Sequence, residues 1–111
     1  MKSNLEATFA MALAAVGCDM IREYKFHPTR KWRLDFADQQ SKTGLEIDGG
    51  EFSGGSHSRG VGMANDYEKR NSATEMGWAI FQITGAMTRK DPLGWARRVK
   101  AVIDRRRDED S

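Results

Sequence analysis

Two carboxylates, Glu46 and Asp48, stand two residues apart in the stretch "LEIDGG", which alternates apolar and acidic side chains. Because side chains alternate across a β-strand, a strand here turns both acids to one face and sends Leu45 and Ile47 into the core. A glycine-rich segment follows, and seven of the eleven glycines fall within 44–62. Glycine lets a backbone approach a ligand closely, so the pattern is suited to holding a cation beside a phosphate.

A third carboxylate, Asp35, lies in the preceding alternating stretch, "KWRLDFA". The alternation predicts Trp32, Leu34 and Phe36 on one face of a strand, with Arg33 and Asp35 on the other. If this strand and the next pair as a hairpin, Asp35 comes beside the other two acids, and three close carboxylates repel one another. A divalent cation among them removes that repulsion, and a few hard oxygen ligands with open positions suit Mg²⁺ or Mn²⁺.

Such an ion would lower the pKa of a bound water and offset charge that builds on a phosphoryl oxygen. Spacing alone also allows a simpler interpretation, in which the acids are solvent-facing strand residues balanced by Arg33 or Lys42.

Three residues of the glycine-rich segment are candidates for contact with a ligand. His57 has a side-chain pKa suited to proton transfer near neutrality, and Arg59 is a candidate phosphate contact. Phe52 is a candidate for contacting a base. The alternative for each is an exposed loop residue without a role.

The remaining pattern predicts the elements that must position these residues, in the order α-β-β-β-α-β-α. A capping box, Ser3 with Glu6, begins the first helix, and Gly17 ends it. Asp91 followed by Pro92 begins the last helix, which frays into "RRRDEDS". The predicted strands are 20–26, 31–37, 43–49 and 78–84, and the middle helix is 64–77 with Gly77 as its stop. A strand, a helix and a strand in succession predict a parallel crossover, hence an α/β domain with a mixed sheet.

Composition limits the number of domains and the classes of protein that are compatible with this sequence. The 111 residues predict a single domain, 1–111, and 39% hydrophobic with 31% charged residues is typical of a soluble globular protein. No apolar run is long enough for a bilayer, so no membrane partner is expected. A single cysteine, Cys18, excludes an internal disulfide and favours a reducing cytoplasm. One cysteine and two distant histidines do not make a structural zinc site. The net charge of +2 is mild, but basic groups gather at "RKWR" (30–33), "EKR" (68–70) and "RRR" (105–107).

Four of these pieces occur in an order that resembles the PD-(D/E)XK nuclease superfamily: Glu6 on the first helix, "RLDFA", "LEIDGG", and "DYEK…GWAIFQIT". Within it the chain is most similar to small endonuclease-like domains related to very-short-patch repair endonucleases, including phage and prophage variants. The likeness runs from Glu6 to Thr84. It implies a restriction-endonuclease-like αβββαβ core, here followed by a C-terminal helix, and Mg²⁺ or Mn²⁺ as cofactor.

On this resemblance, Asp35 matches the central metal-binding aspartate and Glu46 the acid on the neighbouring strand. Glu6 matches a helix glutamate that often joins the site, which competes with its interpretation as a capping residue. Lys69 matches the basic end of a D-x-x-(K/R) pattern. Asp48 is a departure, because the family pattern has a lysine two residues after Glu46.

The lysine that the family pattern has at this position normally orients the attacking water and stabilises negative charge. Because this chain lacks it, another group must do so here. Lys69 and His57 are the candidates, although Lys69 also has the option of pairing with Asp66 one turn earlier on the helix. Arg33 and Arg70, with the loop residues above, are candidate nucleic-acid contacts, and solvated surface is the alternative for each.

The resemblance implies a metal-dependent endodeoxyribonuclease that hydrolyses DNA phosphodiesters in repair, recombination or phage DNA processing. Because the single short domain has no separate recognition module, we expect a structure-selective enzyme that nicks DNA or cuts branched DNA. DNA is the expected partner, a homodimer would supply two sites for two strands, and the bacterial cytoplasm is the expected location. The alternative is a catalytically inactive DNA-binding or assembly module with a nuclease fold, which the missing lysine favours. An RNA substrate is also compatible with the residues.

Overall fold

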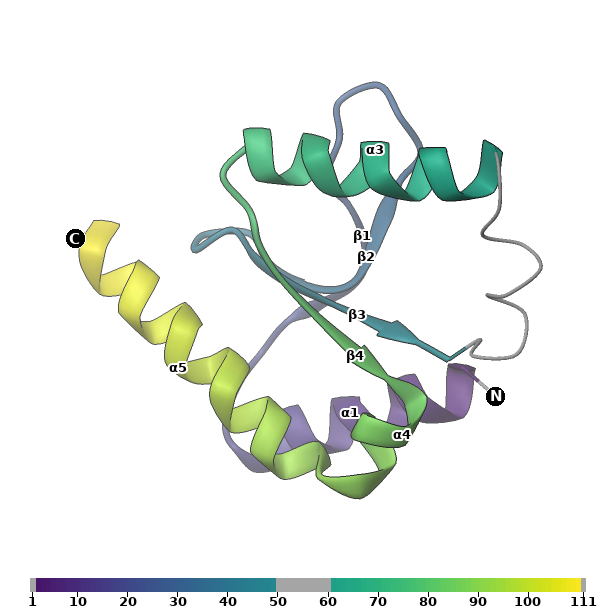
Figure 1. The fold of residues 1–111 in the computed structure, drawn as a ribbon. Coiled ribbons are helices and arrows are strands. Elements are labelled where there is room, and N and C mark those ends of the chain that lie inside the picture. Colours follow the sequence, from purple (N-terminus) through teal and green to yellow (C-terminus); the bar gives the residue numbers. More distant parts are fainter. Residues whose placement is uncertain (1, 50–60, 111) are drawn as a thin grey trace.

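The computed structural model describes residues 2–49 and 61–110, and within them a four-stranded sheet lies between two layers of helices (Figure 1). The strands stand in sequence order: β1 (Ile21–Lys25), β2 (Arg33–Asp38), β3 (Thr43–Asp48) and β4 (Ala79–Thr84). Strands β1, β2 and β3 pair antiparallel, whereas β3 and β4 pair parallel. The predicted mixed sheet with a parallel crossover is therefore confirmed.

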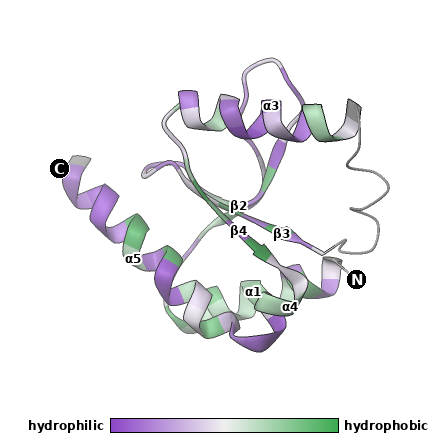
Figure 2. Ribbon diagram, viewed as in Figure 1, coloured by the Kyte–Doolittle hydropathy of each residue, from purple (hydrophilic) through white to green (hydrophobic). Residues whose placement is uncertain are grey.

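The helices are distributed unequally over the two faces of this sheet. α3 (Val61–Glu75) covers one face, and α1 (Lys2–Ala15), α4 (Gly85–Lys90) and α5 (Pro92–Asp110) lie against the other (Figure 1). Figure 2 shows that α3 and the far end of α5 are mostly hydrophilic. None of the helices in the described part of the chain is long and apolar enough to cross a membrane.

Several predicted helix ends are confirmed. Gly17 follows α1 with a φ of 71°, and Gly77 follows α3 with a φ of 87°, both in the left-handed region that glycine adopts readily. The Asp91 Oδ1 accepts the backbone N–H of Gly94 at 3.0 Å and so caps α5, which begins at Pro92.

Other predicted ends are wrong. α1 begins at Lys2, so Ser3 lies inside the helix instead of capping it. α5 does not fray at "RRRDEDS" but continues to Asp110. The sequence prediction also missed α4, whose cap is the Thr84 hydroxyl, which accepts the N–H of Met87 at 3.0 Å.

The predicted alternation along β2 is wrong at one point. Phe36 packs in the core against α1 and α5, whereas Leu34 belongs to the core under α3, so the two side chains lie on opposite faces. The pleat is interrupted at Asp35 between them. Across from Asp35 on β1, Glu23 has a φ of 53°, and the β2–β3 register ends with the pair Phe36–Leu45. A local break of this kind turns the next side chain to the other face.

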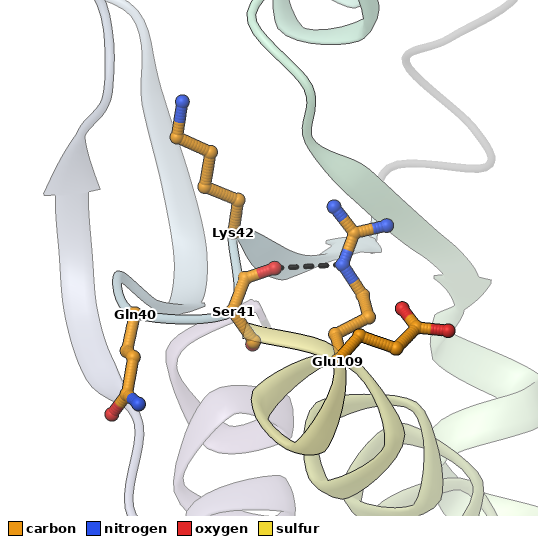
Figure 3. A pocket seen from close by; sticks show the side chains of 5 residues that line it. Gln40, Ser41, Lys42 and Glu109 are labelled. Carbon is orange, nitrogen blue, oxygen red and sulfur yellow. Dashed lines mark hydrogen bonds between the residues drawn. The ribbon is translucent and has the colours of Figure 1, made fainter. Parts of the chain in front are cut away.

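Arginines near the end of α5 tie this helix to the start of β3. Arg106 Nε donates to the Ser41 carbonyl at 2.7 Å, the bond drawn in Figure 3, and its Nη2 donates to the Gly77 carbonyl at 2.7 Å. Arg107 bonds both carboxylate oxygens of the buried Asp38. Beside these contacts lies a hollow of about 350 Å³ lined by Gln40, Ser41, Lys42, Arg106 and Glu109 (Figure 3).

Candidate metal centre

Three carboxylates from three elements converge beside the sheet. Glu6 comes from α1, Glu23 from β1 and Asp35 from β2, and one oxygen of each lies within 4.8 Å of the others. Glu6 and Asp35 are buried, with only 9% and 5% of each residue exposed, whereas Glu23 is exposed. The group therefore has a buried side and a side open to solvent.

Asp35 is held in place by the neighbouring strand. Its Oδ2 accepts the backbone N–H of Ile47 at 2.8 Å, at the point where the β2–β3 register has ended. A buried carboxylate needs such a donor, because burial without a hydrogen bond is costly. The break in the pleat thus gives the carboxylate its position and its partner.

Arginines offset part of the charge of this group. Arg22 Nη2 lies 3.0 Å from Glu6 Oε1, and the Arg22 guanidinium carbon lies 5.4 Å from the centre of the Phe36 ring. Arg33 lies 4.0 Å from Glu23. Glu6 is therefore engaged by an arginine of the adjacent strand rather than by the expected capping box.

Glu46 and Lys69 form a pair on the α3 side of the sheet. Lys69 Nζ lies 2.5 Å from Glu46 Oε2, and both side chains are about four-fifths buried, with 19% and 20% exposed. Lys69 thus contacts the acid of β3 directly, across a long sequence separation, which the local alternative of pairing with Asp66 did not anticipate. Leu45 and Ile47, on either side of Glu46, pack in the other core as predicted.

The structure places the remaining predicted residues as follows. Asp48 ends β3, exposed and in register with Thr84, and neither Asp48 nor Glu46 belongs to the group of three acids. Arg33 and Arg70 are exposed, and Arg70 lies 6.0 Å from the centre of the Tyr67 ring. Phe52, His57 and Arg59 lie outside the described residues.

Glu23 is the member of the group that sequence reasoning missed. The signal for it was the turn-forming stretch "HPTR" at 27–30, between the predicted strands 20–26 and 31–37. A hairpin centred on that turn brings position 22 or 23 opposite Asp35, and the observed β1–β2 register places Glu23 there. The positive φ of Glu23 carried no sequence signal, because the residue is not glycine.

The group fits a small divalent cation. Ligand oxygens about 2.1 Å from one Mg²⁺ lie at most about 4.2 Å apart, so oxygens within 4.8 Å need only small side-chain rotations. Hard carboxylate oxygens suit Mg²⁺ or Mn²⁺ better than a soft metal. The hollow beside α5 that is described above lies elsewhere, at the turn between β2 and β3.

Comparisons of the chain with protein-family models, with curated proteins and with solved structures found no match.

Proposed function

We propose that this protein is a Mg²⁺- or Mn²⁺-dependent endodeoxyribonuclease that hydrolyses phosphodiester bonds in DNA. One observation carries the proposal: Glu6 and Asp35, two acids that the PD-(D/E)XK resemblance selects from distant parts of the sequence, lie within 4.8 Å of each other and of Glu23. Two solvated surface acids have no reason to meet in a largely buried position.

The order of elements supports the same fold family. One helix, three antiparallel strands, a helix and a parallel strand follow each other as in the αβββαβ core that the resemblance implies. α4 is an addition between that core and the C-terminal helix.

Glu6, Glu23 and Asp35 are the residues that would hold the cation. When bound, the ion supplies an activated water and stabilises charge on the phosphate. The bond from Ile47 orients the Asp35 carboxylate, and Arg22 restrains the Glu6 carboxylate. These contacts keep the two buried ligands in place before the ion arrives, as preorganised sites require.

We propose that Lys69 supplies the positive charge that, in the family pattern, comes from a lysine two residues after Glu46. Asp48 occupies that sequence position here, and Lys69 instead reaches β3 from α3, where it bonds Glu46 at 2.5 Å. A lysine ammonium group can orient a water or stabilise a phosphate oxygen. The same pair also favours the second candidate, an inactive DNA-binding module, because Lys69 neutralises Glu46 and leaves it less available to a metal.

A cleavage assay tests the function. Supercoiled, linear, single-stranded and branched DNA are incubated with the wild-type protein in Mg²⁺, Mn²⁺ or chelator. We expect metal-dependent cutting that falls by at least about 100-fold in Asp35→Asn, which keeps an oxygen to accept the Ile47 N–H but loses the charge. Lys69→Met is expected to reduce cutting by about 100-fold or more.

Glu68→Gln, an exposed change on α3, is the matched control and is expected to cut like the wild type. Cutting that persists in Asp35→Asn contradicts the assigned site. A folded wild type that binds DNA but cuts nothing with either metal identifies the binding module instead.

A further inference from the structure

The segment that joins β1 to β2 concentrates positive charge. Residues 24–34 contain Lys25, Arg30, Lys31 and Arg33 and no acid, although acids flank the segment on both sides. Arg30, Lys31 and Arg33 are exposed. Arg33 lies 4.0 Å from Glu23, and the remaining positive charge of this segment attracts a polyanion.

Arg30 is held rigidly within this segment. Its guanidinium carbon lies 3.8 Å from the centre of the Trp32 ring, and its Nη2 donates to the Asn65 side-chain oxygen of α3 at 3.0 Å. His27 Nδ1 accepts the backbone N–H groups of Thr29 and Arg30, which shapes the turn. An arginine held by stacking and by a hydrogen bond loses little freedom when it binds an anion.

The segment lies close to the candidate metal centre. Lys25 and Arg33 are paired two residues beyond Glu23 and Asp35 in the same hairpin, which is roughly 7 Å along the strands. Figure 1 shows the β1–β2 connection rising beside α3. A nucleic-acid strand at the metal centre would therefore reach Lys25 and Arg33 within one or two nucleotides, and the rest of the segment beyond them.

The basic run near the end of α5 does not offer an equivalent surface. In "RRR" at 105–107, Arg106 bonds two backbone carbonyls and Arg107 bonds Asp38, so both hold α5 against the sheet. Acids follow them directly at 108–110. The run at 105–107 is thus less open to a ligand than the β1–β2 segment, and the exposed Arg97 and Arg105 of α5 serve as the comparison.

We propose that the β1–β2 segment is a DNA backbone clamp, in which Arg30 and Lys31 bind phosphates of the strand that enters the metal centre. This inference deepens the proposed nuclease function and rests on it for the identity of the polyanion. The contacts are to phosphates, so they position the strand without selecting its base sequence.

Binding is measured without metal, so that it is separated from cleavage. Fluorescence anisotropy of a labelled 20-bp duplex is recorded in chelator between about 50 and 200 mM salt for wild type, Lys31→Gln and Arg30→Gln/Lys31→Gln. Loss of two phosphate contacts is expected to weaken binding by about tenfold or more. It is also expected to reduce the slope of log K against log salt by about 1.8.

Arg97→Gln/Arg105→Gln, which removes two exposed arginines of α5, is the control with the same change in net charge. Lys31→Gln guards against a fold effect, since it leaves the Arg30 contacts intact and is expected to reduce the slope by about 0.9. Circular dichroism of each variant checks the fold.

An equal loss of DNA affinity in the α5 control and in the Arg30/Lys31 variant overturns the proposal. A wild type that binds no duplex overturns it as well. Poly-glutamate that competes as well as DNA per charge overturns the choice of partner. Binding that depends on the segment without any cleavage supports the clamp and contradicts the nuclease. Cleavage by the wild type, together with DNA binding that is equally strong in wild type and the Arg30/Lys31 variant, supports the nuclease and contradicts the clamp.

Discussion

At the scale of single residues, the carboxylate of Asp35 has two tasks. It accepts the Ile47 N–H, which satisfies a backbone donor of β3, and it faces Glu6 and Glu23. Both tasks need a charged or polar oxygen at this position, so an apolar side chain would leave a buried N–H without an acceptor. The residue is therefore important for folding as well as for the proposed metal site.

Glu23 offers a test that separates metal binding from stability. Without metal, Glu23→Gln removes one of three close negative charges and also the pair with Arg33, so the free energy of unfolding is expected to change by no more than a few tenths of a kcal/mol. With Mn²⁺, loss of a ligand is expected to weaken binding about tenfold, which removes about 1.4 kcal/mol of metal-dependent stabilisation.

Urea unfolding in chelator and in Mn²⁺ measures both effects, with Glu68→Gln as the exposed control on α3. The same Mn²⁺ stabilisation in Glu23→Gln and wild type would show that Glu23 does not ligate the ion.

At the scale of elements, the packing of strands against each other limits the size of the side chains between them. A Cβ at Gly44 would lie 2.7 Å from Leu34 Cδ1 and 3.1 Å from Ile80 Cδ1, so a larger residue there would require the ends of these side chains to shift. Two residues further along β3, Lys69 of α3 reaches Glu46.

The junction between α5 and the sheet is predicted to depend on pH through Asp38. Burial opposes ionisation of this carboxyl, but hydrogen bonds from Arg107 and Ser41 outweigh it and lower the Asp38 pKa below its usual value. Because the pKa is lower in the folded state, the stabilisation is present above about pH 4, the usual carboxyl range, and is lost as pH falls through the folded-state pKa.

Asp38→Asn is expected to lower the free energy of unfolding by about 1–3 kcal/mol at pH 7 and by progressively less below pH 4. Urea unfolding from pH 7 to pH 3 measures the difference from wild type, with Asp104→Asn on the exposed face of α5 as the control. A difference that does not depend on pH would show that the charge of Asp38 is not what ties α5 to the sheet.

At the scale of the whole molecule, the core between the sheet and α1, α4 and α5 encloses Cys18. Burial, followed by the nearby negative charge of Asp38, raises the pKa of the thiol above its usual value. Its alkylation should therefore report on opening of the core as a unit.

Iodoacetamide at pH 8 is expected to modify Cys18 at least roughly tenfold more slowly in the native protein than in the urea-unfolded chain. The urea dependence of labelling is expected to coincide with that of tryptophan fluorescence, as for two-state unfolding. Native and unfolded chains that react at the same rate would contradict the burial of Cys18.

The order and type of most elements could be predicted from the sequence, because strand alternation and glycine stops are local signals. "TGLEIDG" and "WAIFQIT" became β3 and β4, and the helix between them required a parallel crossover. α4 was missed because its six residues are too short for a helical period to be recognised.

The sequence by itself determined the alternation of β3, the antiparallel pairing of the early strands and the acids available for chemistry, since these follow from residue type and chain connectivity. Only the tertiary structure decided which acids meet. Pairing of β1 with β2 placed Glu23 beside Asp35, α1 added Glu6, and α3 placed Lys69 beside Glu46. Such groupings join elements that are distant in sequence, and local periodicity carries no information about the distance between their side chains.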